Sequence, residues 1–261
     1  MNILDKILRD KVKEVASAKK KIPLIRMRET ALRLPPKKFS FRKALVRGTS
    51  VTVIAEIKKR SPSGGLLSRG FDPARIAREY ELAGASAISV LTDKKYFGGA
   101  ASFIPQVKKA VSVPVLRKDF VVDEYQVYEA RLMNADAILL IARALTKKKL
   151  RSLYRTAERL GLDVLFEVHN AAELKKVLAL KPVIVGVNNR DLGTLRVDLG
   201  LSMRLSRMIP EKVIFVAESG IQTSAHLELL RAFGADAALV GESLMRDKHP
   251  GKALERLLSH T

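Results

Sequence analysis

Charged and amide side chains stand at the ends of short apolar runs in this 261-residue chain. Several lysines and carboxylates gathered in one site could transfer protons, because a lysine supplies positive charge and a carboxylate can act as a base or stabilise a developing cation. Such a site would suit an anionic substrate. Each residue taken alone has a second interpretation, a structural ion pair. The residues are Glu56, Lys58, Lys118, Glu167, Asn188, Arg190, Glu218 and Ser219.

Three neighbours of these residues have simpler interpretations. Arg117 and Asp119 flank Lys118, and the alternation of side chains along a strand turns them away from the face on which Lys118 lies. We therefore expect both to have structural roles. His169 follows Glu167 by two residues, and it either caps the next helix or belongs to the site.

Two glycine-containing segments near the end of the chain are typical of phosphate binding. Ser219-Gly220 follows one apolar run, and Gly241-Glu242 follows the next. Glycine lets backbone N–H groups approach an anion, and the start of a short helix adds a favourable dipole. The alternative is two ordinary glycine turns. A phosphate here would require the Glu242 side chain to point away from it. The loop at 58–65 would add further donors and could close over a substrate.

Eight short apolar runs recur from residue 51 onward, with amphipathic stretches between them. Each run is apolar throughout instead of alternating, which is typical of a parallel strand buried on both faces. The stretches at 73–83, 146–160 and 223–233 begin at capping residues and end next to glycine, as helices do. The apolar runs are 51–57, 86–91, 113–117, 135–141, 163–168, 182–187, 213–218 and 236–241.

This alternation of strands and helices predicts an α/β protein, a single (β/α)8 TIM barrel. Eight such units in about 200 residues fit a closed barrel better than an open sheet. No Gly-x-Gly-x-x-Gly follows the first strand, so a dinucleotide-binding fold is not favoured. In a barrel of this kind the active site lies at the carboxyl ends of the strands. The polar side chains should therefore meet in one mouth.

Residues 1–50 are expected to form an N-terminal extension of a single domain that spans residues 1–261. An amphipathic helix is predicted over residues 2–20, and the segment 22–50, broken by two prolines, is expected to be a connection. We expect the extension to pack over one end of the barrel. The apolar residues at helical spacing in the predicted helix are Ile3, Ile7, Leu8 and Val12.

The net charge of +21 is the unusual bulk property of the chain. Residues 1–50 hold 15 Lys and Arg against 4 Asp and Glu. This excess gives either a solvated basic face or a field that attracts an anionic substrate. A basic nucleic-acid-binding protein is the alternative from a different class. We expect no nucleic-acid partner, because the aromatic residues do not interleave with the basic runs.

The chain contains no cysteine, which excludes disulfides, zinc–thiolate sites and thiol nucleophiles. No run approaches the roughly 20 apolar residues that a membrane span needs. The N-terminal residues lack the apolar centre of a secretory signal. We therefore expect a soluble, cytoplasmic protein without a membrane partner. We also expect a monomer.

Seven segments resemble the indole-3-glycerol phosphate synthase family, in the right order along nearly the whole chain. The most specific is PVLRKDFVVDEYQVYEARLMNADAILLIA at 114–142. The others are AEIKKRSPSGG (55–65), SVLTDKKYFGGA (89–100), FEVHNAAEL (166–174), VGVNNRDLGTLRVDL (185–199), VAESGI (216–221) and VGESLM (240–245).

The resemblance implies a carboxy-lyase of tryptophan biosynthesis. Enzymes of that family convert 1-(2-carboxyphenylamino)-1-deoxyribulose 5-phosphate to indole-3-glycerol phosphate and release CO₂ and water. No cofactor and no metal are expected, because the reaction needs proton transfers and no redox step. The alternative among enzymes is phosphoribosylanthranilate isomerase or another phosphate-binding barrel enzyme. Such enzymes share the phosphate loops but do not explain the LRKDF and FEVHN segments.

The resemblance also implies roles for individual residues. Lys118 resembles the general acid that activates the substrate ketone, and Glu56 and Lys58 resemble a pair that transfers protons and holds the substrate carboxylate. Glu167 resembles a carboxylate that stabilises a cationic intermediate or takes part in dehydration. The division of acid and base roles among these four stays open. Positions expected to contact substrate are Asn188, Arg190, Glu218 and Ser219, with Phe97 and Phe120 beside the anthranilate ring and Ser61, Gly220, Gly241 and Glu242 at the phosphate.

Overall fold

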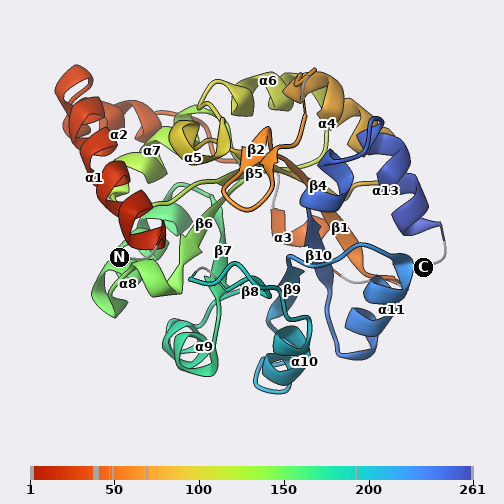
Figure 1. The fold of residues 1–261 in the computed structure, drawn as a ribbon. Helices are drawn as coiled ribbons and strands as arrows, with labels where there is room; N and C mark the ends of the chain where they lie inside the picture. Colours follow the sequence, from red (N-terminus) through yellow and green to blue (C-terminus); the bar gives the residue numbers. More distant parts are fainter. Residues whose placement is uncertain are drawn as a thin grey trace.

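The computed structural model describes residues 3–37, 41–46, 48, 50–68, 70–191 and 193–259. Eight parallel strands close into a barrel in which each strand pairs with the next one along the chain and the last pairs with the first (Figure 1). The predicted (β/α)8 barrel is therefore confirmed. Its strands are β1 (Thr52–Ile57), β4 (Ala87–Leu91), β5 (Val115–Lys118), β6 (Ala137–Ile141), β7 (Asp163–Val168), β8 (Ile184–Asn188), β9 (Ile214–Glu218) and β10 (Ala237–Val240).

Helices surround the barrel as an outer ring (Figure 1). Three of them begin where the sequence predicted, because the side chains of Asp72, Thr146 and Thr223 accept hydrogen bonds from the first backbone N–H groups. The helices between strands are α4 (Pro73–Leu82), α6 (Phe103–Ala110), α7 (Glu124–Leu132), α8 (Lys147–Arg159), α9 (Ala171–Leu178), α10 (Gly200–Ser206) and α11 (Ser224–Ala232), and α13 (Pro250–Leu258) follows the last strand.

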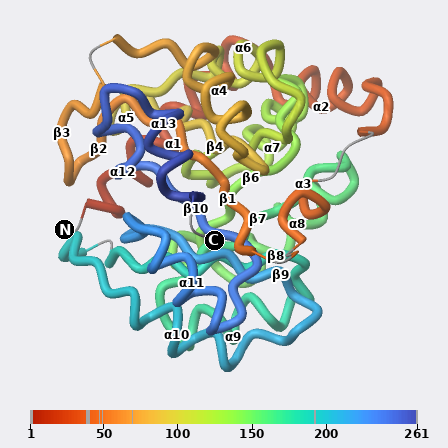
Figure 2. Tube along the Cα trace, turned by 90° about the vertical axis from the view of Figure 1, so that its right-hand side faces the viewer, coloured from red at the N-terminus to blue at the C-terminus, as the bar shows by residue number. Residues whose placement is uncertain are grey.

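Short elements mark the two ends of the barrel. Figure 2 shows the hairpin of β2 (Arg60–Ser61) and β3 (Gly65–Leu66) near α12 (Glu242–Met245) at one end, and α3 (Phe41–Ala44) at the other. The first end carries the carboxyl ends of the strands. It also holds α5 (Lys94–Phe97), which follows β4, and the short 3-10 helix η1 (Ala142–Ala144), which follows β6.

The amino end of the barrel is filled by α3 and the residue after it. Phe41 and Leu45 are fully buried and belong to the same apolar cluster as Ile54, Leu116 and Leu165 from the barrel strands. Fully buried aromatic side chains of this kind stabilise a fold by about 3–5 kcal/mol relative to alanine. The N-terminal segment therefore closes the end of the barrel opposite the mouth.

The predicted connection over residues 22–50 is wrong in part, because it contains α3 and a second helix, α2 (Leu24–Leu32). Met27 and Ala31 lie one turn apart and are buried, and α2 packs along α7. Sequence analysis missed this helix because two buried residues make a weak pattern. The two prolines at 35 and 36 follow the helix and do not interrupt it.

The predicted helix at the N-terminus is confirmed as α1 (Ile3–Lys21), but its predicted apolar face is wrong in part. Its buried residues are Leu4, Ile7, Lys11 and Val15, whereas Val12 is 57% exposed. The buried face differs from the predicted one because it includes a lysine, and a prediction from apolar residues alone does not place a lysine on a buried face. Among the residues that the structure describes, no helix has both the length and the apolar character needed to cross a membrane.

Candidate active site

A cavity of about 630 Å³ opens at the carboxyl ends of the strands. It is lined by every residue that the sequence analysis assigned to catalysis, substrate or phosphate. These residues come from seven barrel strands or the segments after them, and they meet because parallel strands of a barrel end at one face. They are Glu56, Lys58, Ser61, Phe97, Lys118, Phe120, Glu167, Asn188, Arg190, Glu218, Ser219, Gly220, Gly241 and Glu242.

The ammonium of Lys118 lies among three glutamates. Its Nζ atom is 3.6 Å from Glu56 Oε2, 3.7 Å from Glu167 Oε2 and 3.8 Å from Glu218 Oε2. These residues lie at or next to the ends of β1, β5, β7 and β9, which are alternate strands of the barrel, so their inward side chains share one layer. All three glutamates are buried, and Glu56 also accepts a hydrogen bond of 2.5 Å from Lys58.

Burial and charge together set the ionisation of this cluster. Burial by itself would lower the pKa of Lys118, but the three carboxylates outweigh it and raise that pKa. Burial opposes ionisation of Glu56, yet Lys58 and Lys118 lower its pKa below the usual range. Lys118 is therefore an ammonium at neutral pH, and a proton donor is present.

Two of the glutamates have opposite ionisation behaviour. Burial raises the pKa of Glu218 to about 8, and the charge of Glu167 adds to this effect. Both carboxylate oxygens of Glu218 are buried without a hydrogen-bond partner in the described part of the chain. In contrast, Lys118 and His169 overcome the effect of burial on Glu167 and lower its pKa to about 2. Of these two carboxyl groups, Glu218 is thus protonated and Glu167 ionised at neutral pH.

A glycine that sequence analysis did not single out makes room for Glu218. Gly186 lies in the middle of β8, and a Cβ atom there would stand 2.1 Å from Glu218 Oε1. Any side chain at this position would displace the carboxylate. Glycine inside a strand often marks such a close approach. The glycine in the apolar run PVIVGV at 182–187 could therefore have indicated a close contact at this position.

The ends of β9 and β10 form a narrow edge of the cavity. Ser219 and Gly220 have positive φ angles of +66° and +83°. A Cβ on Gly220 would lie 2.4 Å from Val197 Cγ1, and one on Gly241 would lie 2.4 Å from Glu56 Oε1. Both positions therefore require glycine, and both line the cavity.

Glu242 at this edge is balanced by two guanidinium groups. Its Oε2 atom lies 3.0 Å from Arg190 Nη2, and its Oε1 atom lies 2.8 Å from Arg246 Nη2. Arg246 also lines the cavity. Sequence analysis missed it, although its position four residues after Glu242 is the spacing of ion pairs on a helix.

One wall of the cavity is apolar. The rings of Phe97 and Phe120 have centroids 6.0 Å apart. Ile3, Leu4 and Ile7 of α1 line the same cavity. The N-terminal helix therefore contributes directly to the mouth, whereas sequence analysis expected it only to cover one end of the barrel.

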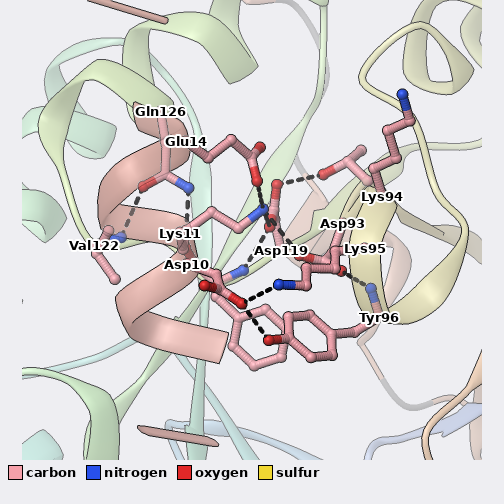
Figure 3. Close-up of polar contacts among 12 residues, drawn as sticks. Asp10, Lys11, Glu14, Asp93, Lys94, Lys95, Tyr96, Asp119, Val122 and Gln126 are labelled. Carbon is pink, nitrogen blue, oxygen red and sulfur yellow. Dashed lines mark hydrogen bonds and ion pairs between the residues drawn. The ribbon is translucent and has the colours of Figure 1, made fainter. Parts of the chain in front are cut away.

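A buried lysine fixes α1 to the rim (Figure 3). Nζ of Lys11 lies 3.0 Å from Asp93 Oδ2 and 3.0 Å from Asp119 Oδ1, and only 1% of its side chain is exposed. Asp93 caps α5 through the backbone N–H of Tyr96. The preceding residue of α1, Asp10, accepts a hydrogen bond of 2.7 Å from Lys95. The helix is thus joined by charge to the loops that follow β4 and β5.

Arg117 and Asp119 lie in ion pairs, as sequence analysis expected. Nη2 of Arg117 is 2.6 Å from Glu129 Oε2 and 3.1 Å from Asp119 Oδ2. Oδ1 of Asp119 accepts a hydrogen bond from the backbone N–H of Phe120. Asp119 therefore links Arg117, Lys11 and the aromatic wall. Among the described residues, no group of three or more acidic or histidine side chains has an arrangement that could hold a metal ion.

A closed (β/α)8 barrel with an ammonium and carboxylates at its mouth defines an acid–base enzyme of the TIM-barrel class. The sequence model of the family "indole-3-glycerol phosphate synthase" matches residues 4–257. The indole-3-glycerol phosphate synthase of Chlorobium phaeovibrioides is 46% identical over 244 residues, covering 94% of this chain and 95% of the relative. That of Ruminiclostridium cellulolyticum is 45% identical over 256 residues, covering 98% of each chain.

This chain belongs to the indole-3-glycerol phosphate synthase family. The predicted family is therefore confirmed, and the protein is a lyase of tryptophan biosynthesis. Neither the enzyme alternative, phosphoribosylanthranilate isomerase or another phosphate-binding barrel enzyme, nor the alternative of a nucleic-acid-binding protein receives support. The thiamine phosphate pyrophosphorylase of Pyrococcus furiosus has a similar fold, with a TM-score of 0.62 at 16% identity over 84% of this chain and 96% of that one.

Proposed function

We propose that this chain closes the indole ring of 1-(2-carboxyphenylamino)-1-deoxyribulose 5-phosphate, with Lys118 as the general acid. The observation that carries this proposal is the position of Lys118 Nζ, within 3.6–3.8 Å of Glu56, Glu167 and Glu218 inside the cavity. An ammonium held there can donate a proton to the ketone oxygen while the aromatic carbon attacks the carbonyl carbon. The attack forms the new carbon–carbon bond, and the ketone oxygen becomes a hydroxyl group.

Loss of CO₂ and then of water completes the proposed reaction. The carbon–carboxylate bond breaks and its electrons restore the aromatic ring. The new hydroxyl group then takes a proton and leaves as water, while a base removes a proton from the adjacent carbon. Glu167 suits the stabilisation of the cationic intermediates, because its low pKa of about 2 keeps it ionised. The hydrogen-bonded pair of Lys58 and Glu56 suits the substrate carboxylate and a proton transfer.

The phosphate of the substrate is proposed to lie between the ends of β9 and β10. Support comes from Gly220 and Gly241, which line the cavity at these strand ends and leave no room for a Cβ atom. Arg246 and Ser61 line the same cavity and add donors. A structure determined with sulfate should show the anion against these amides. An anion bound elsewhere in the mouth would refute this placement.

The remaining substrate contacts follow from the same orientation. The anthranilate ring fits beside Phe97 and Phe120, where the wall is apolar. Asn188, Arg190 and Ser219 line the same cavity and suit the hydroxyl groups of the sugar chain. Glu218, with a pKa of about 8, is protonated at neutral pH and can donate a hydrogen bond to such a hydroxyl.

The test of the function is direct because the chain contains no tryptophan. Indole fluorescence that appears when the carboxyphenylamino-deoxyribulose phosphate is added therefore comes from the product. We expect fluorescence to rise with CO₂ release in equal amounts. A protein that binds this substrate and forms no indole would contradict the proposal.

We also infer that the protein works as a monomer in the cytoplasm. The absence of cysteine is consistent with a reducing compartment. Sedimentation analysis at micromolar concentration should give the mass of one chain, and a dimer would contradict the inference. Retention on DNA at physiological salt, lost as salt rises, would instead support phosphate-backbone binding.

A further inference from the structure

His169 connects a catalytic glutamate with a carboxylate on the outer helix layer. It follows β7, and its Nε2 atom lies 3.3 Å from Glu167 Oε1. Its Nδ1 atom lies 3.3 Å from Oε2 of Glu173, on the first turn of α9. The imidazole is 3% exposed. The three side chains therefore form a buried row that ends at Lys118, because Glu167 Oε2 faces Lys118 Nζ.

The geometry rules out the simpler interpretation of His169, that it caps the next helix. The residue that caps α9 is Asn170, whose side chain accepts a hydrogen bond from the backbone N–H of Glu173. Glu173 is itself fixed, because its carboxylate accepts hydrogen bonds from Asn170 Nδ2 at 2.8 Å and from the backbone N–H of His169 at 2.9 Å. The imidazole is thus free of any capping role and is held between two carboxylates.

The two buried glutamates of the mouth differ mainly in this contact. Glu167 and Glu218 lie 3.7 Å and 3.8 Å from the same ammonium, and both are buried. Glu167 has a second cationic neighbour in His169, whereas Glu218 has both oxygens without a hydrogen-bond partner in the described chain. Burial opposes the charge of His169, but Glu167 and Glu173 raise its pKa to about 10.

We propose that His169 is a positioning residue that holds Glu167 ionised and oriented toward Lys118, and so distinguishes it from Glu218. This inference rests on the proposed function, in which an ionised Glu167 stabilises the cationic intermediate. The charged and titratable groups that face Glu167 are Lys118 from β5, Glu56 from β1, Glu218 from β9 and His169, with the amide of Asn188 from β8. Removal of the imidazole charge leaves Lys118 as the cation next to Glu167, while Lys58 pairs with Glu56.

The test is the pH dependence of kcat/KM in the His169→Gln variant. Glutamine has a similar reach and carries no charge, so the variant removes the charge of the imidazole beside Glu167. In the parent enzyme Glu167 is ionised throughout the measurable range. In the variant we expect the acid limb of the profile to move up by about 1 pH unit or more, because a neighbouring charge shifts a pKa by about 1–3 units. A shift of that size takes the pKa of Glu167 from about 2 to about 3–5, so activity at pH 4 relative to pH 8 should fall in the variant, by about tenfold for the largest shift, and stay parental at pH 7 and above.

A second variant protects the test against a failure to fold. Glu173→Gln keeps a side chain that can cap α9, because Gln serves at this position of a capping box as Glu does. It removes one of the two carboxylates that keep the imidazole charged, and we expect a smaller shift of the acid limb in the same direction. His249→Gln, at an exposed histidine before α13, is the matched control and should leave the profile unchanged.

The melting temperature of each variant is measured over the same pH range. A lower melting temperature with a parental pH profile would show that His169 is only structural and would overturn the inference. A shifted profile in both His169→Gln and Glu173→Gln supports it. An inactive parent enzyme would instead count against the proposed function, so the two failures are distinguishable.

Discussion

Nζ of Lys118 lies 3.7 Å from Oε2 of Glu167, across the inside of the barrel mouth. One residue ends β5 and the other lies near the end of β7, so this ion pair exists only when the barrel is closed. Charge pairs in a buried setting are stronger than at the surface, but they lose hydration. In the proposed mechanism the substrate therefore enters a site in which the proton donor and the stabilising carboxylate are already in place, which reduces the reorganisation needed during the reaction.

The first prediction concerns Lys118→Met, which keeps most of the apolar stem and removes the ammonium. Turnover should fall at least about 100-fold, because general acid catalysis contributes about 10² to 10⁴ in rate. The Michaelis constant should change less. Turnover and melting temperature are measured on one preparation, with Lys109→Met, at an exposed lysine of α6, as the control. A folded Lys118 variant that retains more than about a tenth of parental turnover is incompatible with this role.

Glu218→Gln should change the way stability depends on pH. The ordinary pKa of this carboxyl group is 4.5, and burial raises it to about 8 in the folded protein. The folded state therefore binds this proton more tightly than the unfolded state, and stability falls as the pH rises from about 4.5 to about 8. Glutamine removes this loss. The melting temperature of the variant minus that of the parent should increase between pH 5 and pH 8.

The control for Glu218 is Glu211→Gln, at an exposed position between α10 and β9. The melting temperature of this control variant minus that of the parent should stay constant over the same range of pH. If the melting temperature of Glu218→Gln minus that of the parent is equally constant, the folded protein leaves the Glu218 carboxyl near its ordinary pKa.

Gly220→Ala tests the phosphate edge. Its φ of +83° disfavours alanine, and the new Cβ would lie 2.4 Å from Val197 Cγ1, so the loop after β9 has to move. We expect the Michaelis constant to rise at least about tenfold, because one misplaced backbone donor costs about 1.4 kcal/mol or more when the anion is left without it. Turnover at saturating substrate should fall less.

Gly234→Ala is the matched control, since Gly234 has a nearly identical φ of +84° and open space around the added Cβ. It carries the same backbone strain far from the cavity. Equal Michaelis constants in the two variants would show that strain alone, and not the phosphate edge, explains the effect at Gly220.

Lys11→Met should destabilise the protein and weaken substrate binding together. The variant leaves Asp93 and Asp119 buried without their shared cation, and breaking a buried ion pair costs about 3–5 kcal/mol. Because these aspartates hold the segments that carry Phe97 and Phe120, the Michaelis constant should also rise. Urea unfolding and steady-state kinetics measure the two effects. Lys13→Met, on the exposed side of α1, should change neither.

Activity should persist after exhaustive chelation. The proposed reaction moves protons and releases CO₂ and water, and none of its steps changes the oxidation state of a cofactor. Turnover measured before and after dialysis against a chelator should agree within error. Recovery of lost activity on addition of a divalent metal, with magnesium and zinc tested separately, would refute the expectation.

Much of this architecture follows from local sequence. Continuous apolar runs such as 163–168 identify strands that are buried on both faces, and β7 (Asp163–Val168) occupies that same range. Helix starts follow from capping side chains such as Thr146, which bond within their own turn. Once the barrel is inferred, the polar residue after each strand is placed at the mouth by topology. The membership of the cavity could therefore be predicted without coordinates.

Other features depend on distances that no local pattern encodes. Lys11 is buried on α1 because Asp93 and Asp119, from two separate loops, surround its ammonium. Glu167 and Glu218 are the same residue type at equivalent strand ends, yet their pKa values are about 2 and about 8. Burial raises both pKa values, but Lys118 and His169 overcome it at Glu167, whereas the charge of Glu167 adds to it at Glu218. Coulomb energies depend on separation in space and on burial, and only the closed barrel determines these two quantities.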